Sequence, residues 1–275
     1  MVPVHTVNLG FVSKAVIFRE SPFPASDELR TVLVTGAAGR IGSCFAELSH
    51  DRYKLRLMVR GDEAEIDAIR PFGDVVECDL ADQQGLKDAC AGIDTVIHLA
   101  ADHRVHAPWE ELLPNNIVGT YNLFAAAKEQ GCRRVVYASS VNAMNSAPRG
   151  IQIRPDDPVS PGNLYGVSKT FGESLCRLYA TREELSSFAL RIGAFQTLHS
   201  IRHHHHRIPF SIFVSPRDLN QLLNLCVDDL RVQFGIFHAL SANQYNHFDI
   251  SETCEVLGYR PVDDAYAPEP DQASN

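Results

Sequence analysis

The sequence has no long hydrophobic run, no Cys-x-x-Cys pair and no excess of basic residues. None of its 275 residues belongs to an apolar stretch approaching the 18 or more residues that a membrane-spanning helix needs. The formal net charge of −9 argues against non-specific binding to nucleic acid, which depends on basic surfaces. We therefore expect neither a membrane nor a nucleic acid among the partners of this chain.

The seven cysteines are odd in number and widely spaced, at positions 44, 78, 90, 132, 176, 226 and 254. This pattern predicts no zinc site and no disulfide framework, so we expect reduced thiols in a cytoplasmic protein. Residues 1–30 lack the apolar core and small-residue cleavage site of a secretory signal, although their few charges are basic up to Glu20, as in a transit peptide. We expect them to be an N-terminal extension on the surface, and whether they belong to the mature protein stays open.

Strand-like and helix-like segments alternate between residues 31 and 193. Strands are expected at 31–36, 55–59, 74–79, 94–101, 133–140 and 187–193, and helices at 40–49, 63–70, 83–92, 108–131 and 163–184. This alternation predicts an α/β protein, a Rossmann doubly wound parallel sheet with helices on both faces. Residues 194–275 are less regular, with a helix at 216–230, a strand at 234–242 and a helix at 249–259. We expect them to form a small C-terminal substrate lobe, interleaved with the sheet.

The segment TGAAGRIG joins the first strand to the first helix and carries Gly36, Gly39 and Gly42. The first glycine permits a tight turn, the second a close approach of backbone to a pyrophosphate, and the third close packing of helix on strand. The helix that begins at Arg40 and Ile41 presents free N–H groups to phosphates. The segment predicts a dinucleotide site, in which Asp79 and Leu80, at the end of the third strand, contact the adenine.

The end of the second strand lacks the acid that NAD sites usually place there for the adenosine ribose hydroxyls. Val59 is followed by Arg60, and the first acid is Asp62. An arginine at this turn can pair with a 2′-phosphate, and Arg40 adds positive charge nearby. We therefore expect NADP to be favoured over NAD. The alternative is that Arg60 is a solvated turn residue.

Tyr165 and Lys169 lie four residues apart in YGVSK, on one face of an expected helix. A phenol is a weak base at neutral pH, and a neighbouring ammonium lowers its pKa. The lysine can also hold the ribose of a nicotinamide. Ser139 and Ser140 end the fifth strand, at the sheet edge where doubly wound folds bind ligands, and one hydroxyl can hydrogen-bond the reacting oxygen. A Tyr-x-x-x-Lys pair alone means little, but downstream of a glycine-rich loop it predicts hydride chemistry.

As a set, TGAAGRIG, HLAA (98–101), NNIVGTYNL (115–123), ASS (138–140) and YGVSK resemble the extended short-chain dehydrogenase/reductase family in order and spacing, over about residues 31–195. The resemblance implies Ser140 as the catalytic serine, Tyr165 as the base and Lys169 as its partner. It also implies a homodimer in which the two long helices form a shared bundle.

Further residues take their expected roles from the same resemblance. Leu99, Ala100, Ala101 and Asn116, the motif asparagine of the long helix, would lie at the cofactor. His98 is expected to pack at the strand end beside the cofactor and not to act as an acid or base.

Within the family, NLYGVSKTFGE, LRIGA and NHFDISETCEVLGYRP resemble the uronate dehydrogenase branch, over about residues 31–262. Enzymes of that branch oxidise C1 of a free hexuronic acid to a lactone. The sequence departs from it at the substrate pocket, where the Ser-Ser-Asn-His of the branch reads Ser139-Ser140-Val141-Asn142 and Ala194 replaces a serine. We expect substrate contacts from Ser139, Ser140 and Asn142.

The arginine that binds the substrate carboxylate in the branch should lie in the following loop, where Arg202 and Arg207 flank four histidines. Either can form a bidentate contact, and the alternative is a solvated basic loop. Histidines confined to one loop rarely build a defined metal site, so no metal is expected. The sequence thus predicts an NAD(P)-dependent dehydrogenase of a small free sugar or sugar acid, either a hexuronate or a neutral aldose.

Two other functions remain open. A nucleotide-sugar epimerase or dehydratase with tightly bound NAD is disfavoured because no asparagine follows Leu190-Arg191 and the C-terminal lobe is short. A nicotinamide-sensing protein without turnover would keep the glycine loop but would not need the Tyr-Lys pair.

Overall fold

The computed structural model describes residues 14–24, 28–61, 66–148, 150–203 and 208–268. In these ranges one eight-stranded sheet has the strand order β1-β10-β7-β6-β5-β2-β3-β4. Its strands are β1 Val16–Phe18, β2 Thr31–Thr35, β3 Lys54–Val59, β4 Asp74–Glu77, β5 Thr95–His98, β6 Arg134–Ser140, β7 Ser186–Ile192 and β10 Val232–Ala239. All pairings are parallel except that of β1 with β10, so the predicted doubly wound sheet is confirmed.

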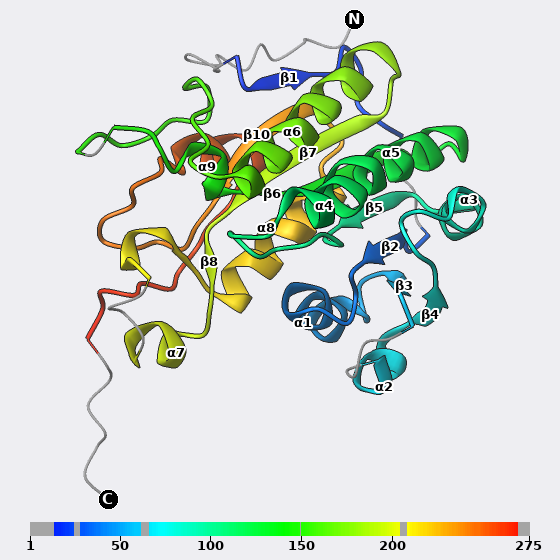
Figure 1. Ribbon diagram of the computed structural model, residues 1–275, viewed down its shortest axis with the longest axis horizontal. Helices are drawn as coiled ribbons and strands as arrows, with labels where there is room; N and C mark the ends of the chain where they lie inside the picture. The colour runs from blue at the N-terminus through cyan, green and yellow to red at the C-terminus, as the bar shows by residue number, and fades with distance from the viewer. Residues whose placement is uncertain (1–13, 25–27, 62–65, 149, 204–207, 269–275) are drawn as a thin grey trace, which may run out of the picture.

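Helices cover both faces of the sheet (Figure 1). One layer contains α1 Arg40–Ser49, α2 Ile66–Ile69, α8 Pro216–Asp228 and α9 Ser251–Leu257, and the other contains α3 Gln83–Cys90, α5 Gly119–Glu129 and α6 Leu164–Arg182. Because successive strand residues point to opposite faces, Val32 and Val34 pack in the first layer and Leu33 in the second. This burial of both faces explains the continuous apolar strands of the sequence.

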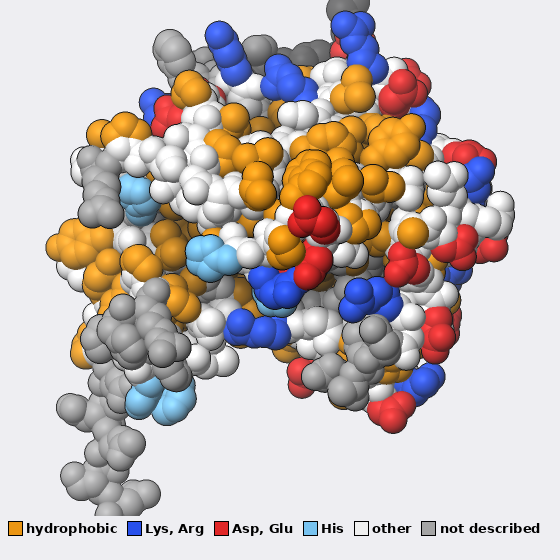
Figure 2. Space-filling model, viewed as in Figure 1, with side chains coloured by type: hydrophobic (Ala, Val, Ile, Leu, Met, Phe, Trp, Pro, Cys, Tyr) orange, Lys and Arg blue, Asp and Glu red, His pale blue; other side chains and the backbone are white. Residues whose placement is uncertain are grey.

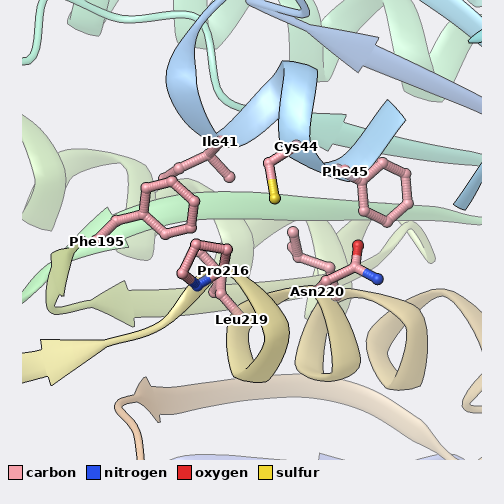
Figure 3. Close-up of a pocket in the computed structure, with 8 residues that line it drawn as sticks. Ile41, Cys44, Phe45, Phe195, Pro216, Leu219 and Asn220 are labelled. Carbon is pink, nitrogen blue, oxygen red and sulfur yellow. The ribbon is translucent and has the colours of Figure 1, made fainter. Parts of the chain in front are cut away.

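Helix α1, which follows the glycine loop, packs against α8. Figure 3 shows the side chains of Cys44 and Phe45 on the side of α1 that faces α8, where Leu219 lines the same pocket. Phe45 and Leu219 are buried, and burying a side chain of this size contributes about 1.5–3 kcal/mol. The Ser49 hydroxyl donates to the side chain of Asn224 (3.0 Å) at the far end of the contact. This packing fixes the direction in which the N-terminus of α1 points.

The expected helix 108–131 is interrupted. It consists of α4 Trp109–Leu112, a π-helical segment η2 Leu113–Val118 and α5. The backbone N–H of Gly119 donates to the carbonyl of Pro114, five residues earlier. Proline has no N–H to donate to the preceding turn, and a π segment accommodates that loss.

The described part of the N-terminal extension includes a strand that the sequence did not predict. Val16 pairs with Gly235, which makes β1 an antiparallel edge strand. A three-residue strand is too short to show a periodicity. It covers the edge of β10, which would otherwise expose unpaired backbone groups.

Residues after 193 return to the same sheet through β10 and also form smaller elements. These are β8 Ala194–Phe195 and β9 Phe213–Val214, which pair in parallel, α7 Leu198–His203 and the single turn η4 Phe210–Ile212. Two further single turns lie earlier in the chain, η1 Arg70–Phe72 and η3 Val141–Met144. The buried Asp218 of α8 accepts hydrogen bonds from the backbone of Val262 and Asp263 and thereby holds the C-terminal segment. Among the described helices, none is both long enough and apolar enough to cross a membrane.

Candidate active site

A cleft of about 900 Å³ opens at the carboxyl ends of β2, β5 and β6. The chain winds away in opposite directions from the adjacent strands β2 and β5, and ligands of doubly wound sheets bind at such a point. Most of the predicted site residues line this cleft, namely Gly36, Gly39, Arg40, Ile41, Gly42, Arg60, Asp79, Leu80, Leu99, Ala100, Ala101, Ser139, Ser140, Tyr165 and Lys169. Segments more than 100 residues apart in the sequence thus meet in one cavity.

The glycine loop has the close backbone packing that a phosphate-binding turn requires. Gly36 has a φ of +64°, and a Cβ there would lie 2.9 Å from the backbone nitrogen of Ala100. A Cβ at Gly42 would lie 2.5 Å from the carbonyl oxygen of Gly36. Gly39 precedes α1 with no side-chain cap, so the first N–H groups of α1 remain available to a ligand. This cradle fits the pyrophosphate of a dinucleotide.

Ser140, Tyr165 and Lys169 come together on the opposite wall. Asn163 caps α6 by accepting a hydrogen bond from the N–H of Gly166 (2.7 Å), so Tyr165 lies in the first helical turn. The Tyr165 phenol lies close enough to the Ser140 hydroxyl, at the end of β6, for that hydroxyl to lower the pKa of the phenol. Lys169 lies one turn later, with its Nζ 5.5 Å from the centre of the Tyr165 ring. Its ammonium donates to the carbonyl of Ala138 (2.9 Å).

Burial is the largest cause of the pKa shifts of Tyr165 and Lys169. It raises the pKa of the Tyr165 phenol, the Ser140 hydroxyl acts in the opposite direction, and Asp102 raises the pKa further. Burial also lowers the pKa of Lys169 to about 8. The expectation that Lys169 leaves the Tyr165 pKa below its ordinary value is therefore not met in this structure. The physical reason is that the phenol is almost completely buried, which disfavours the phenolate.

His98 and Thr35 form a neutral polar pair buried at the ends of β5 and β2, next to the cleft residues Leu99 and Ala100. The Thr35 hydroxyl accepts hydrogen bonds from the N–H groups of Leu99 and Ala100 and lies 2.8 Å from His98 Nδ1, to which it can donate. Burial and the Lys169 charge lower the pKa of His98 to about 3. A fully buried neutral imidazole at this place agrees with the predicted packing role.

Asn116 does not line the cleft, but its side chain hydrogen-bonds two segments that do. Its side-chain oxygen accepts from the Asp102 N–H (2.8 Å), and its side-chain nitrogen donates to the Asp102 carbonyl (2.9 Å) and to the Ser168 hydroxyl (3.0 Å). Ser168 in turn donates to the carbonyl of Tyr165 (2.7 Å). Asn116 thus connects the loop after β5 to the first turn of α6, although it does not line the cleft as a cofactor-binding residue would.

The predicted substrate-binding residues are dispersed. Ser139 lines the cleft, but its hydroxyl donates to the buried Glu173 (2.6 Å). Asn142 does not line the cleft and bonds Ser140 instead. Arg202 of α7 donates to the carbonyls of Asp264 (3.3 Å) and Ala267 (2.6 Å). Arg207 lies outside the described residues, so the carboxylate contact assigned to these arginines stays a prediction.

The cleft mouth contains polar residues that the sequence interpretation missed. They follow β5 or belong to the adjoining helical segments and comprise Asp102, His103, Arg104, Glu111 and Asn115. Arg104 pairs with both Asp102 and Glu111. Their position after HLAA, at the carboxyl end of a strand, is the signal that would have identified them.

A family profile described as the NAD-dependent epimerase/dehydratase family matches residues 32–208 of the chain. The chain belongs to this family. The match includes the glycine loop, the serine pair and the Tyr-Lys pair, and it confirms the predicted nicotinamide-dependent oxidoreductase class.

Several family members resemble the chain over most of its length. It is 33% identical to the NAD-dependent glucose-6-phosphate dehydrogenase of Haloferax volcanii over 85% of this chain and 94% of that protein. It is 34% identical to the uronate dehydrogenase of Agrobacterium fabrum over 87% of each. The crystal structure of glucuronic acid dehydrogenase from Chromohalobacter salexigens superposes with a TM-score of 0.77 at 30% identity, covering 90% of this chain and 93% of that one. These similarities confirm the predicted family and Rossmann fold.

Proposed function

We propose that this protein oxidises C1 of a small free sugar or sugar acid, with a nicotinamide cofactor as the hydride acceptor. The observation that carries the proposal is the convergence of Ser140, Tyr165 and Lys169 on one wall of the cleft that the glycine loop bounds on the other. Relatives that cover most of the chain and act as dehydrogenases of glucose 6-phosphate or uronate support it.

The residues divide the reaction between them. Tyr165 takes the proton of the C1 hydroxyl as the C1–H hydride leaves, and the C1 oxygen becomes the carbonyl oxygen of a lactone. Ser140 hydrogen-bonds that oxygen and stabilises the charge that develops on it. The Lys169 ammonium lies 5.5 Å from the centre of the Tyr165 ring, and its positive charge opposes the effect of burial on the phenol. A nicotinamide, when bound, supplies the hydride-accepting carbon.

NADP is the cofactor that we propose to be favoured over NAD. Arg60 follows β3 and lines the cleft with Arg40, which donates to the carbonyl of Phe195 (2.7 Å). The Arg60 guanidinium at the end of β3 suits a 2′-phosphate, and Arg40 adds positive charge to the same cleft. We expect Arg60→Ala to lower kcat/KM for NADP and to leave that for NAD unchanged. Equal kcat/KM for both cofactors in the wild type would contradict the preference.

The substrate is either a hexuronate or a neutral aldose, and the segment with Arg202 and Arg207 distinguishes them. If an arginine there binds a carboxylate, Arg202→Gln or Arg207→Gln raises KM for the hexuronate and leaves KM for the aldose unchanged. If neither substitution changes KM for a hexuronate, the assignment of this segment to a substrate carboxylate is wrong.

A homodimer in the cytoplasm is the state that we propose. Exposed apolar side chains on the two long helical segments support the dimer, among them Trp109, Tyr121, Leu164, Val167 and Leu178. Figure 2 shows hydrophobic side chains gathered over the outer faces of α5 and α6. A contiguous exposed apolar patch of this kind is typical of a surface that binds another protein. In analytical ultracentrifugation we expect the wild type to sediment as a dimer and the Tyr121→Glu variant as a monomer.

The experiment that tests the function follows nicotinamide absorbance with a panel of free aldoses, hexuronates and nucleotide sugars, each with NAD and with NADP. Reduction by a free sugar or uronate is the expected result. Conversion of a nucleotide sugar with no net change in the cofactor would instead make the protein an epimerase. Cofactor binding without any turnover would favour the nicotinamide-sensing alternative.

A further inference from the structure

A chain of three asparagines connects the start of α6 to the Ser140 hydroxyl. Asn142 donates to Ser140 Oγ from its backbone N–H (3.2 Å) and from its side-chain Nδ2 (3.1 Å). The side-chain Oδ1 of Asn142 accepts from Asn145 Nδ2 (3.0 Å) and from Asn163 Nδ2 (3.2 Å). The side chain of Asn142 is thus held at both ends.

Two backbone amides determine the direction of every hydrogen bond in this chain. Asn163 accepts from the N–H of Gly166, a group that can only donate, so the other end of its side chain must be the nitrogen. Asn145 likewise accepts from the N–H of Gly162. Both asparagines therefore present donors to Asn142, which must turn its oxygen toward them and its nitrogen toward Ser140.

The consequence falls on the serine proton. Because the Ser140 oxygen accepts two hydrogen bonds from Asn142, its lone pairs are engaged and its own O–H is directed elsewhere. The Tyr165 phenol is the group on its other side, and the proposed reaction places the reacting oxygen between the two hydroxyls. A hydroxyl in this state acts as a donor, which is the role that stabilises a developing negative charge.

Packing keeps the three elements of the chain close together. A side chain at Gly166 would collide with the carbonyl oxygen of Asn142, so the glycine permits η3 to lie directly against the first turn of α6. The residue before this glycine is Tyr165. The hydrogen-bonded asparagines therefore connect Ser140 to the same helical turn that carries Tyr165. This links the orientation of the serine to the position of the base.

We propose that Asn142 is a positioning residue that holds Ser140 as a hydrogen-bond donor toward the reacting oxygen, and that Asn145 and Asn163 set its orientation. The inference rests on the proposed dehydrogenase reaction. It gives Asn142 a role through Ser140, in place of the direct substrate contact expected from the sequence.

Two substitutions of Asn142 separate orientation from packing. Asn142→Asp keeps the shape but offers Ser140 an oxygen, so the serine proton turns toward the carboxylate and away from the substrate. Asn142→Ala leaves the backbone N–H donor in place. We expect the aspartate variant to lose about 10²-fold in kcat, as for removal of a transition-state donor, and the alanine variant to lose less than about 10-fold. A purely structural role predicts the reverse order, because alanine removes more contacts.

A neutral double variant controls for the charge of the aspartate. Asn145→Ala with Asn163→Ser removes both donors to Asn142, and serine still caps α6 because it accepts from the same N–H. The side-chain amide of Asn142 can then flip and present its oxygen, in place of its nitrogen, to Ser140. We expect a lower kcat with little change in KM and an acid limb of the kcat profile displaced to higher pH, since the Ser140 hydroxyl lowers the pKa of Tyr165.

A second readout needs no turnover. The ultraviolet absorbance of tyrosinate, with Tyr165→Phe as the blank, reports the ionisation of Tyr165 directly, and the double variant should ionise at higher pH than the wild type. If the wild type oxidises no sugar, the proposed function fails while this titration still tests the asparagine chain. An unchanged titration and unchanged kcat in the double variant, or equal losses for the two Asn142 variants, would overturn the inference.

Discussion

The burial of Lys169 sets its proposed function against the stability of the fold. Lys169 is 3% exposed, and burial lowers its pKa from 10.5 to about 8, so at neutral pH the folded protein holds a charged ammonium in a site that disfavours it. Below pH 8 both the folded and the unfolded chain carry the proton, and the full cost of burial is present. Between about pH 8 and 10.5 the folded chain binds fewer protons than the unfolded one, so its stability rises with pH.

We therefore predict that Lys169→Met abolishes turnover and yet increases the free energy of unfolding at neutral pH, by about 1–3 kcal/mol. The gain should shrink as the pH approaches about 10, because the wild type is relieved of its charge there. Urea unfolding at the two pH values measures the difference. A variant that is less stable than the wild type at neutral pH would show that the hydrogen bond to Ala138 outweighs the burial of the charge.

At the scale of elements, α6 is fastened to the sheet by a buried ion pair. Arg191 of β7 makes two hydrogen bonds to the carboxylate of Glu173 (2.8 and 2.9 Å), and Ser139 of β6 donates to the same carboxylate. Glu173 lies one helical turn after Lys169, so the ion pair holds α6 against β7, and the Ser139 hydrogen bond holds it against β6.

Removing one partner of a buried pair leaves an uncompensated charge. We expect Glu173→Gln to lower the free energy of unfolding by about 3–5 kcal/mol, because Arg191 stays buried. The double variant Glu173→Leu with Arg191→Met removes both charges and should lose less. Denaturant unfolding compares them, and a Glu173→Gln variant as stable as the wild type would mean that solvent reaches the guanidinium.

The elements themselves show what sequence patterns can predict. The strands and helices from 31 to 193 were expected close to their observed bounds, since buried parallel strands and amphipathic helices leave strong periodicities. The strand Val16–Phe18 and the pair β8–β9 were missed because two or three residues carry no period. The π segment after Leu112 depends on how Pro114 packs, and the sequence shows only the proline.

The site divides in the same way. Tyr165, Lys169 and the glycine loop were predictable because each is a local motif within eight residues. The function of Asn142 was not, because its partners Asn145 and Asn163 are set by the packing of η3 on α6. The net direction of the Tyr165 pKa also depends on burial, a property of the whole fold.

At the scale of the whole molecule, two buried histidines make the fold sensitive to acid. Burial lowers the pKa of both His98 and His238 to about 3, and the side-chain Nε2 of His238 has no hydrogen-bond partner among the described residues. Folded and unfolded chains are both neutral at these positions above about pH 6.5. Between about pH 6.5 and 3 only the unfolded chain takes up the protons, so stability falls as the pH falls.

Each histidine contributes a slope of about 1.4 kcal/mol per pH unit in this window. We predict that His238→Phe loses less stability than the wild type between neutral pH and about pH 5. Thermal unfolding at the two pH values provides the comparison. Equal acid losses in the two proteins would mean that His238 becomes protonated without unfolding.

The measurement that tests the catalytic assignment most directly uses a sugar deuterated at C1, chosen from the substrates that the protein accepts. We expect deuterium to appear in the reduced nicotinamide with the wild type and the sugar to become a lactone, and Tyr165→Phe to lose the transfer while still binding the cofactor. Deuterium that stays in a sugar whose configuration has changed, or transfer that survives in Tyr165→Phe, would contradict a C1 dehydrogenase with Tyr165 as its base.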